Sequence, residues 1–136
     1  MTIHHVGYLV KNIEKSAQAF RAVGFSDRPY PDGSLVCYDG IRDCDICFMD
    51  HGDICIELVS PKSADSPVYG LLEKYKNSPY HLCFESDNFD ADIEDLRSKG
   101  WSVFTQPTEA PAIEGRNVVF LIHRSAGIIE LIDTGK

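Results

Sequence analysis

The chain has 136 residues, of which 43% are hydrophobic and 10% aromatic, enough to build one domain with a hydrophobic core over residues 1–136. Its formal charge of −8 at pH 7 argues against nucleic acid and anionic membrane surfaces as partners. Five cysteines are an odd count, which favours a reducing compartment over a disulfide framework. With no signal peptide and no long apolar run in view, we expect a cytoplasmic protein.

The first half of the chain, about residues 1–61, combines short apolar strands with one amphipathic helix. Alternation predicts a strand over 3–10, and Asn12 stands where a helix N-cap is expected. An apolar stripe at helical spacing follows and ends at Gly24. Three more strands are predicted, over residues 35–38, 45–49 and 54–59.

A linking helix is predicted within residues 62–77, because Ser66 and Pro67 form a typical helix start. The second half, about residues 78–136, repeats the order of the first. Its predicted elements are a strand over 79–86, a helix over 89–99 and strands over 117–122 and 128–133. The proline-containing stretch between Trp101 and Asn117 is predicted to be irregular.

The two halves match residue by residue at their beginnings. Laid on the first half without a gap, the second places His81 on His5 and Asn88 on Asn12. The last strands match as well, since Ile-Glu-Leu occurs at 56–58 and again at 129–131. A sheet covered by one helix leaves its other face open, so neither half is expected to stand alone. The pattern predicts an α+β fold of two tandem βαβββ modules whose pseudo-symmetric sheets form a cleft.

One residue of a metal-binding type interrupts the apolar pattern in the first and last strands of each half. The four are His5, Glu57, His81 and Glu130. Alternation places them opposite the apolar faces that the helices need, so all four are expected to point into the cleft. Burying a lone carboxylate is costly, and two imidazoles with two carboxylates around a divalent cation would remove that cost.

Four sequence blocks carry a resemblance to a known family. They are residues 4–13, 56–61, 80–88 and 127–131. In their order and spacing they resemble the vicinal oxygen chelate superfamily, whose members include glyoxalase I and methylmalonyl-CoA epimerase. The resemblance implies the glyoxalase/bleomycin resistance/dioxygenase fold and metal ligands at His5, Glu57, His81 and Glu130. His5 is chosen over His4 because it precedes the Val-Gly pair and aligns with His81.

The ligand set separates branches of this superfamily. A carboxylate at Glu57 resembles the glyoxalase I and epimerase branch, because the extradiol dioxygenases use two histidines and one carboxylate. We predict a metal-dependent lyase or isomerase of the glyoxalase I (lactoylglutathione lyase) type. The alternative is methylmalonyl-CoA epimerase or a related acyl-CoA epimerase, whose pattern residues 57–72 resemble. A second alternative is a metal-free small-molecule-binding or resistance protein.

Both enzymatic activities move a proton on a carbon next to a carbonyl. The resemblance implies one divalent ion (Ni, Co, Mn or Zn), which would act as a Lewis acid on a metal-bound enediolate intermediate. Glu130 is the predicted base, and Glu57 is assigned to the opposite face of the substrate. The substrate is expected to be a small thiol adduct or thioester.

Three further interpretations complete the predictions. A homodimer is expected, and the metal ligands come either from one chain or from two. His4 is expected on the packing face and His51 in a turn, both with structural or solvated side chains. The pair Cys44 and Cys47 is assigned no metal role, because strand alternation points the two thiols to opposite faces.

Overall fold

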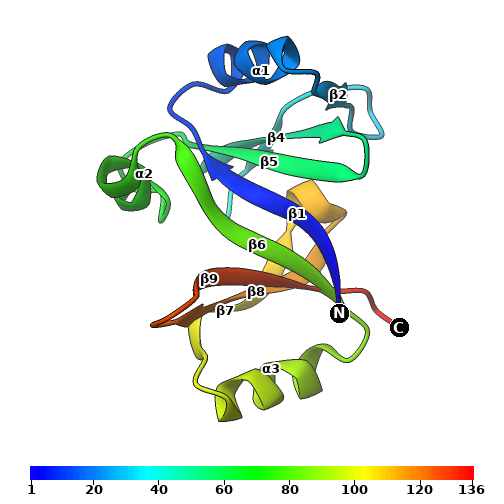
Figure 1. The fold of residues 1–136 in the computed structure, drawn as a ribbon, viewed down its shortest axis with the longest axis vertical. Coiled ribbons are helices and arrows are strands. Elements are labelled where there is room, and N and C mark those ends of the chain that lie inside the picture. The colour runs from blue at the N-terminus through cyan, green and yellow to red at the C-terminus, as the bar shows by residue number, and fades with distance from the viewer. The chain divides into compact units, whose positions relative to one another are not determined.

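The computed structural model describes residues 1–136, which form nine strands, three α-helices and one short 3-10 helix (Figure 1). In chain order these are β1 (Thr2–Leu9), α1 (Ile13–Ala22), β2 (Ser26–Arg28), β3 (Cys37–Asp39), β4 (Cys44–His51), β5 (Ile54–Pro61), α2 (Tyr69–Tyr75), β6 (Ser78–Ser86), α3 (Phe89–Ser98), β7 (Ser102–Ala110), η1 (Pro111–Ile113), β8 (Arg116–His123) and β9 (Gly127–Asp133). The longest helices have ten residues, and none has the length and apolarity that a membrane crossing requires.

The chain divides into two compact units. Val6–Pro79 forms one, called here the 6–79 unit. Tyr80–Lys136 forms the other together with Met1–His5, and it is called here the 80–136 unit. Strand β1 therefore contributes its first residues to the 80–136 unit and Val6 onward to the 6–79 unit. The predicted single domain with a linking helix over 62–77 stays a prediction.

The two units have the same strand topology. In the 6–79 unit the order is β1-β5-β4-β2, with β3 also paired to β4. In the 80–136 unit the order is β6-β9-β8-β7. The first and last strands of each unit run parallel, and the remaining pairs are antiparallel. This confirms the predicted α+β class and the repeated βαβββ order.

Each unit has its own hydrophobic core between its sheet and its first helix. In the 6–79 unit, Ala17 of α1 packs with Ile56 and Leu58 of β5. In the 80–136 unit, the buried side chains of α3 pack with Ile129 and Leu131 of β9. Because side chains alternate along a strand, the residue between each pair points to the other face. These residues are Glu57 and Glu130, as the alternation predicted.

One local prediction is wrong. The stretch after Trp101 was expected to be irregular but forms β7, whose pairing with β8 shifts register on both sides of Thr105. The shift between Thr105 and Thr108 spans Pro107, which lacks the N–H that a regular ladder needs. Helix α2 lies within the predicted range 62–77 and begins at Tyr69. Ahead of it, the Ser66 hydroxyl donates to the Arg42 carbonyl at 2.6 Å and accepts from the Val68 N–H at 3.4 Å. The Asn12 cap is confirmed, since its side chain accepts a hydrogen bond from the Lys15 N–H.

A glycine and a histidine form the same contact in both units. After α1, Gly24 has a φ of +103°, and a Cβ added there would lie 2.8 Å from His51 Nε2. After α3, Gly100 has a φ of +98°, and its Cβ would lie 3.0 Å from His123 Nε2. His51 also packs edge-on against Phe25, with ring centroids 5.2 Å apart. His51 was expected in a turn, but it is the last residue of β4 and pairs with Ile54. Its side chain contacts the turn that ends α1, which agrees with the structural role expected for it.

Gly24→Ala should destabilise the protein by more than its backbone conformation alone explains. An alanine at positive φ costs about 1 kcal/mol, and the contact with His51 adds about 1–3 kcal/mol of overpacking. Gly33→Ala is the matched control, because Gly33 has a φ of +85° and no atom within 4 Å of the added Cβ. Denaturant unfolding of both variants gives the difference. Equal losses of unfolding free energy would show that the contact with His51 has no role.

Candidate metal centre

Two histidines and one glutamate meet in the 80–136 unit. His5 Nε2 lies 3.2 Å from His81 Nε2. Both nitrogens approach the same carboxylate oxygen, because Glu130 Oε1 is 3.3 Å from His5 Nε2 and 3.4 Å from His81 Nε2. The three residues come from three strands, β1, β6 and β9, and their side chains are at most 5% exposed. Three residues that the sequence singled out thus form one cluster.

Strand register explains why Glu130 takes part in this cluster. In the parallel pair β6–β9, Glu130 lies beside Cys83, two residues after His81 and on the same face of β6. On its other side, Glu130 faces Phe120 of β8. The Phe120 ring packs edge-on against His81, with centroids 5.3 Å apart. Glu130 therefore lies between Cys83 and Phe120 in the sheet, and since it is only 4% exposed, water has little access to its carboxylate.

The Glu130 carboxylate carries a negative charge although it is buried, which is energetically unfavourable. Burial raises the pKa of Glu130, but the nearby His5 and His81 outweigh burial and hold this pKa well below the ordinary value of 4.5. Glu130 is therefore ionised at neutral pH. Its Oε1 atom nevertheless has no hydrogen-bond partner, since the two nitrogens lie close by without hydrogen-bond geometry. A buried, ionised oxygen without a hydrogen bond needs a further compensating charge.

A divalent cation would provide that charge. Two imidazole nitrogens and one carboxylate oxygen are a ligand set typical of first-row divalent metals. Their ligand atoms lie within 4.8 Å of one another, close enough to serve one ion. The orphaned Glu130 oxygen and the donor set therefore fit the divalent metal that the sequence predicts. The roles of His5, His81 and Glu130 as ligands of Ni, Co, Mn or Zn stay a prediction.

The fourth predicted ligand, Glu57, belongs to the 6–79 unit. It is 4% exposed and lies in β5 between Gly7 of β1 and Phe48 of β4. Phe48 therefore faces Glu57 as Phe120 faces Glu130. The pKa of the Tyr30 hydroxyl is raised, first by burial and then by nearby groups that include Glu57. Glu57 thus occupies a buried position equivalent to that of Glu130, and its roles as ligand and acid/base group stay predictions.

Sequence reasoning missed the residues that surround this cluster. Phe120 carries no ligand atom, and its place next to His81 follows only from strand pairing. His4 was assigned to the packing face, but its Nδ1 lies 2.8 Å from His5 Nδ1. The aromatic residue in the next-to-last strand of each half, Phe48 and Phe120, was a signal available in the sequence. Cys44 and Cys47 are buried free thiols, and neither belongs to a cluster of side chains that could hold a metal ion.

A family match covers most of the chain. Residues 4–120 match the Glyoxalase/Bleomycin resistance protein/Dioxygenase superfamily. The chain belongs to this superfamily. The match confirms the resemblance to the vicinal oxygen chelate superfamily, and it spans the strands that carry His5, Glu57 and His81.

Several proteins and structures are similar to this superfamily member. Mitochondrial methylmalonyl-CoA epimerase of Homo sapiens is 28% identical, and the alignment covers 95% of this chain and 72% of that protein. A hypothetical protein from Bacillus halodurans has a TM-score of 0.82 at 18% identity, covering 99% of this chain and 95% of the other. A single-substitution variant of Streptomyces coelicolor methylmalonyl-CoA epimerase, in complex with 2-nitronate-propionyl-CoA, has a TM-score of 0.78 at 22% identity, covering 98% of this chain and 94% of the other. The structural matches support the fold.

Removing one histidine of the cluster should abolish tight metal binding. We expect one divalent ion per chain, and His81→Ala should weaken its affinity by at least about 100-fold because the group loses a ligand. His123→Ala is the control, since His123 packs against Trp101 outside the cluster. Competition with a chromophoric chelator measures the affinity, and native mass spectrometry measures the stoichiometry. Equal affinities of His81→Ala and the unsubstituted protein would contradict the site.

Proposed function

We propose that this protein is a divalent-metal-dependent acyl-CoA epimerase of the methylmalonyl-CoA epimerase type. The observation that carries the proposal is the human relative of that name, which aligns with 95% of this chain at 28% identity. The sequence favoured glyoxalase I, with the epimerase as its alternative. The relatives support the alternative better than the main prediction, and they support the prediction of an enzyme of the isomerase kind.

An epimerase of this class must remove a proton from the carbon next to the thioester carbonyl. The C–H bond breaks, its electron pair moves toward the carbonyl oxygen, and a base takes the proton. Glu130 is our candidate for this base, because its carboxylate is ionised and buried in the cluster that would hold the substrate's metal. Glu130 is 4% exposed, so water has little access to its carboxylate, and electrostatic interactions in the site are strengthened.

Inversion requires that a proton return to the opposite face of the same carbon. One group on one side cannot do this, so a second acid/base group is needed. Glu57 is our candidate, since it occupies in β5 the position that Glu130 occupies in β9. The net reaction is an isomerisation that consumes no oxidant and no second substrate.

His5 and His81 hold the centre together in this proposal. Their Nε2 atoms lie 3.3 and 3.4 Å from Glu130 Oε1, and with that oxygen they would form the donor set for the metal. A divalent ion bound there would supply Lewis-acid stabilisation of charge that develops on the thioester oxygens. The rigid β-strands that carry the three residues keep these donors in place before substrate arrives.

The remaining expectations concern the substrate, the oligomeric state and the cellular compartment. The substrate partner in this proposal is a small acyl-CoA thioester, and the Streptomyces coelicolor epimerase bound to 2-nitronate-propionyl-CoA supports this choice. A homodimer and a cytoplasmic location stay predictions. All five cysteines are free thiols, which is compatible with the reducing compartment that the sequence favoured.

Two substrates tested side by side decide between the enzymatic activities. We expect the metal-loaded protein to interconvert the two epimers of methylmalonyl-CoA and to leave methylglyoxal with glutathione unchanged. Chiral separation of the thioester follows the first reaction, and absorbance of the product thioester follows the second. Turnover of the hemithioacetal alone would restore glyoxalase I as the function. Failure of both with a bound metal would reject both activities.

Replacing Glu130 or Glu57 by glutamine should block proton transfer at one face of the substrate α-carbon, and the two substitutions should block opposite faces. In D₂O, Glu130→Gln should lower epimerisation by about 10²–10⁴-fold, the usual contribution of a general base. Deuterium exchange at the substrate α-carbon should persist for one epimer in Glu130→Gln and for the other in Glu57→Gln. Mass spectrometry of each epimer, corrected for exchange without enzyme, measures this. Exchange of the same epimer by both variants would contradict the two-base assignment.

A further inference from the structure

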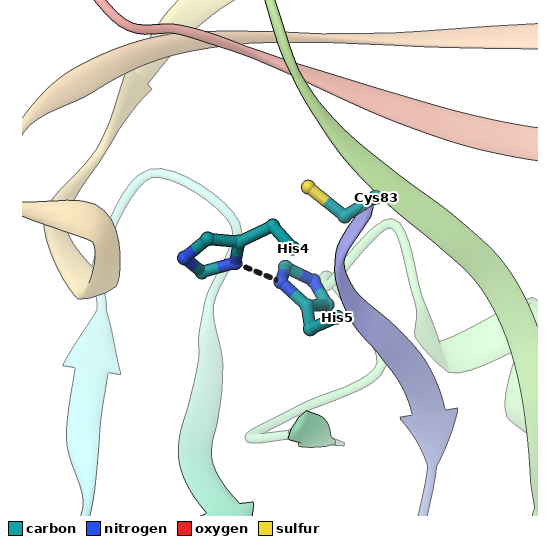
Figure 2. Close-up of side chains that lie close together, drawn as sticks. All are labelled: His4, His5 and Cys83. Carbon is teal, nitrogen blue, oxygen red and sulfur yellow. Dashed lines mark hydrogen bonds between the residues drawn. The ribbon is translucent and has the colours of Figure 1, made fainter. Parts of the chain in front are cut away.

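His4 and His5 are linked by a hydrogen bond between their rings. The two Nδ1 atoms lie 2.8 Å apart, and the dashed line in Figure 2 joins them. The rings meet edge to face, with centroids 5.1 Å apart and an interplanar angle of 77°. Adjacent residues of a regular strand point to opposite faces, so such a contact at the start of β1 is not expected from alternation. It needs an explanation.

The two nitrogens of His5 have different surroundings. Its Nε2 faces His81 and Glu130, whereas its Nδ1 faces His4. A neutral imidazole carries one proton, on one nitrogen or the other. If Nε2 offers its lone pair to a metal, the proton must be on Nδ1. This Nδ1–H then donates to His4 Nδ1, which accepts it.

We propose that His4 is a positioning residue that holds His5 in the tautomer with its proton on Nδ1 and its lone pair on Nε2. The proposal rests on the metal centre of the proposed function and adds a residue to it. Metal-binding histidines commonly donate their other ring N–H to a carboxylate, a carbonyl or water, and this donation fixes the ring orientation. Here an imidazole from the neighbouring residue takes that role.

A second ion at this place is the competing interpretation. One ligand atom from each of His4, His5 and Cys83 lies within 4.8 Å of the others, and Figure 2 draws the three side chains together. His5 would then have to bind one ion through each ring nitrogen and lose its last ring proton. The hydrogen-bond distance between His4 and His5 favours a shared proton over a shared ion. The two interpretations differ in metal stoichiometry.

Metal affinity of His4 variants tests the role. In the full-length protein, His4→Leu should weaken Zn²⁺ binding by about 10–100-fold, the usual effect of removing such a partner. His4→Asn should restore most of the affinity, because the Asn oxygen can accept at the position of Nδ1. Ile3→Ala is the same-strand control, since Ile3 is 65% exposed, and should bind like the unsubstituted protein. Circular dichroism of the metal-free variants checks that they fold.

The ring tautomer and the stoichiometry provide independent readouts. In the Zn²⁺-loaded protein, ¹⁵N–¹H correlation spectra should show the His5 proton on Nδ1 and the His4 proton on Nε2. One Zn²⁺ per chain, unchanged in Cys83→Ala, is also expected. Two ions per chain, with the second lost in Cys83→Ala, would overturn the proposal, as would equal affinities of His4→Leu and the unsubstituted protein. Absence of Zn²⁺ binding by the unsubstituted protein would instead reject the metal centre itself, and this role with it.

Discussion

The buried carboxylate of Glu130 is the constraint on which the proposed chemistry depends. An ionised oxygen without a hydrogen bond is costly in an apolar interior, and only nearby positive charge makes it tolerable. The imidazole nitrogens of His5 and His81 lie within 3.4 Å and hold the pKa of Glu130 low, and a bound cation would supply the compensating charge. The buried carboxylate and the two imidazoles destabilise the interior, but together they form a ligand set for a cation. The buried Glu130 carboxylate therefore lowers the stability of the fold and provides a ligand for the proposed metal.

Strand pairing makes this arrangement possible. The first and last strands of the 80–136 unit pair in parallel, which places the residue after Ile129 on the face that carries His81 and Cys83. The helix-side residues of the same strands build the core with α3. One face of the sheet thus supplies the folding free energy, and the other supplies the functional groups. A shift of register by one residue would exchange these two faces.

Duplication provides a second carboxylate in the same setting. Glu57 lies between Gly7 and Phe48, and Glu130 lies between Cys83 and Phe120. A reaction that removes a proton from one face of a carbon and returns it to the other benefits from two such groups. The two settings are not identical, because a glycine in one is replaced by a thiol in the other.

Several features followed from the sequence alone, because hydrophobic periodicity and a duplicated pattern report which face of a strand is buried. They are the α+β class, the repeated βαβββ order, and the identity of His5, His81 and Glu130 as neighbours. Strand β7 was missed, since its proline and its register shifts hide the alternation. The Phe120 contact and the His4–His5 hydrogen bond were also beyond the sequence. Pairing register and ring orientation arise only when distant segments pack together, so the tertiary structure alone decided them.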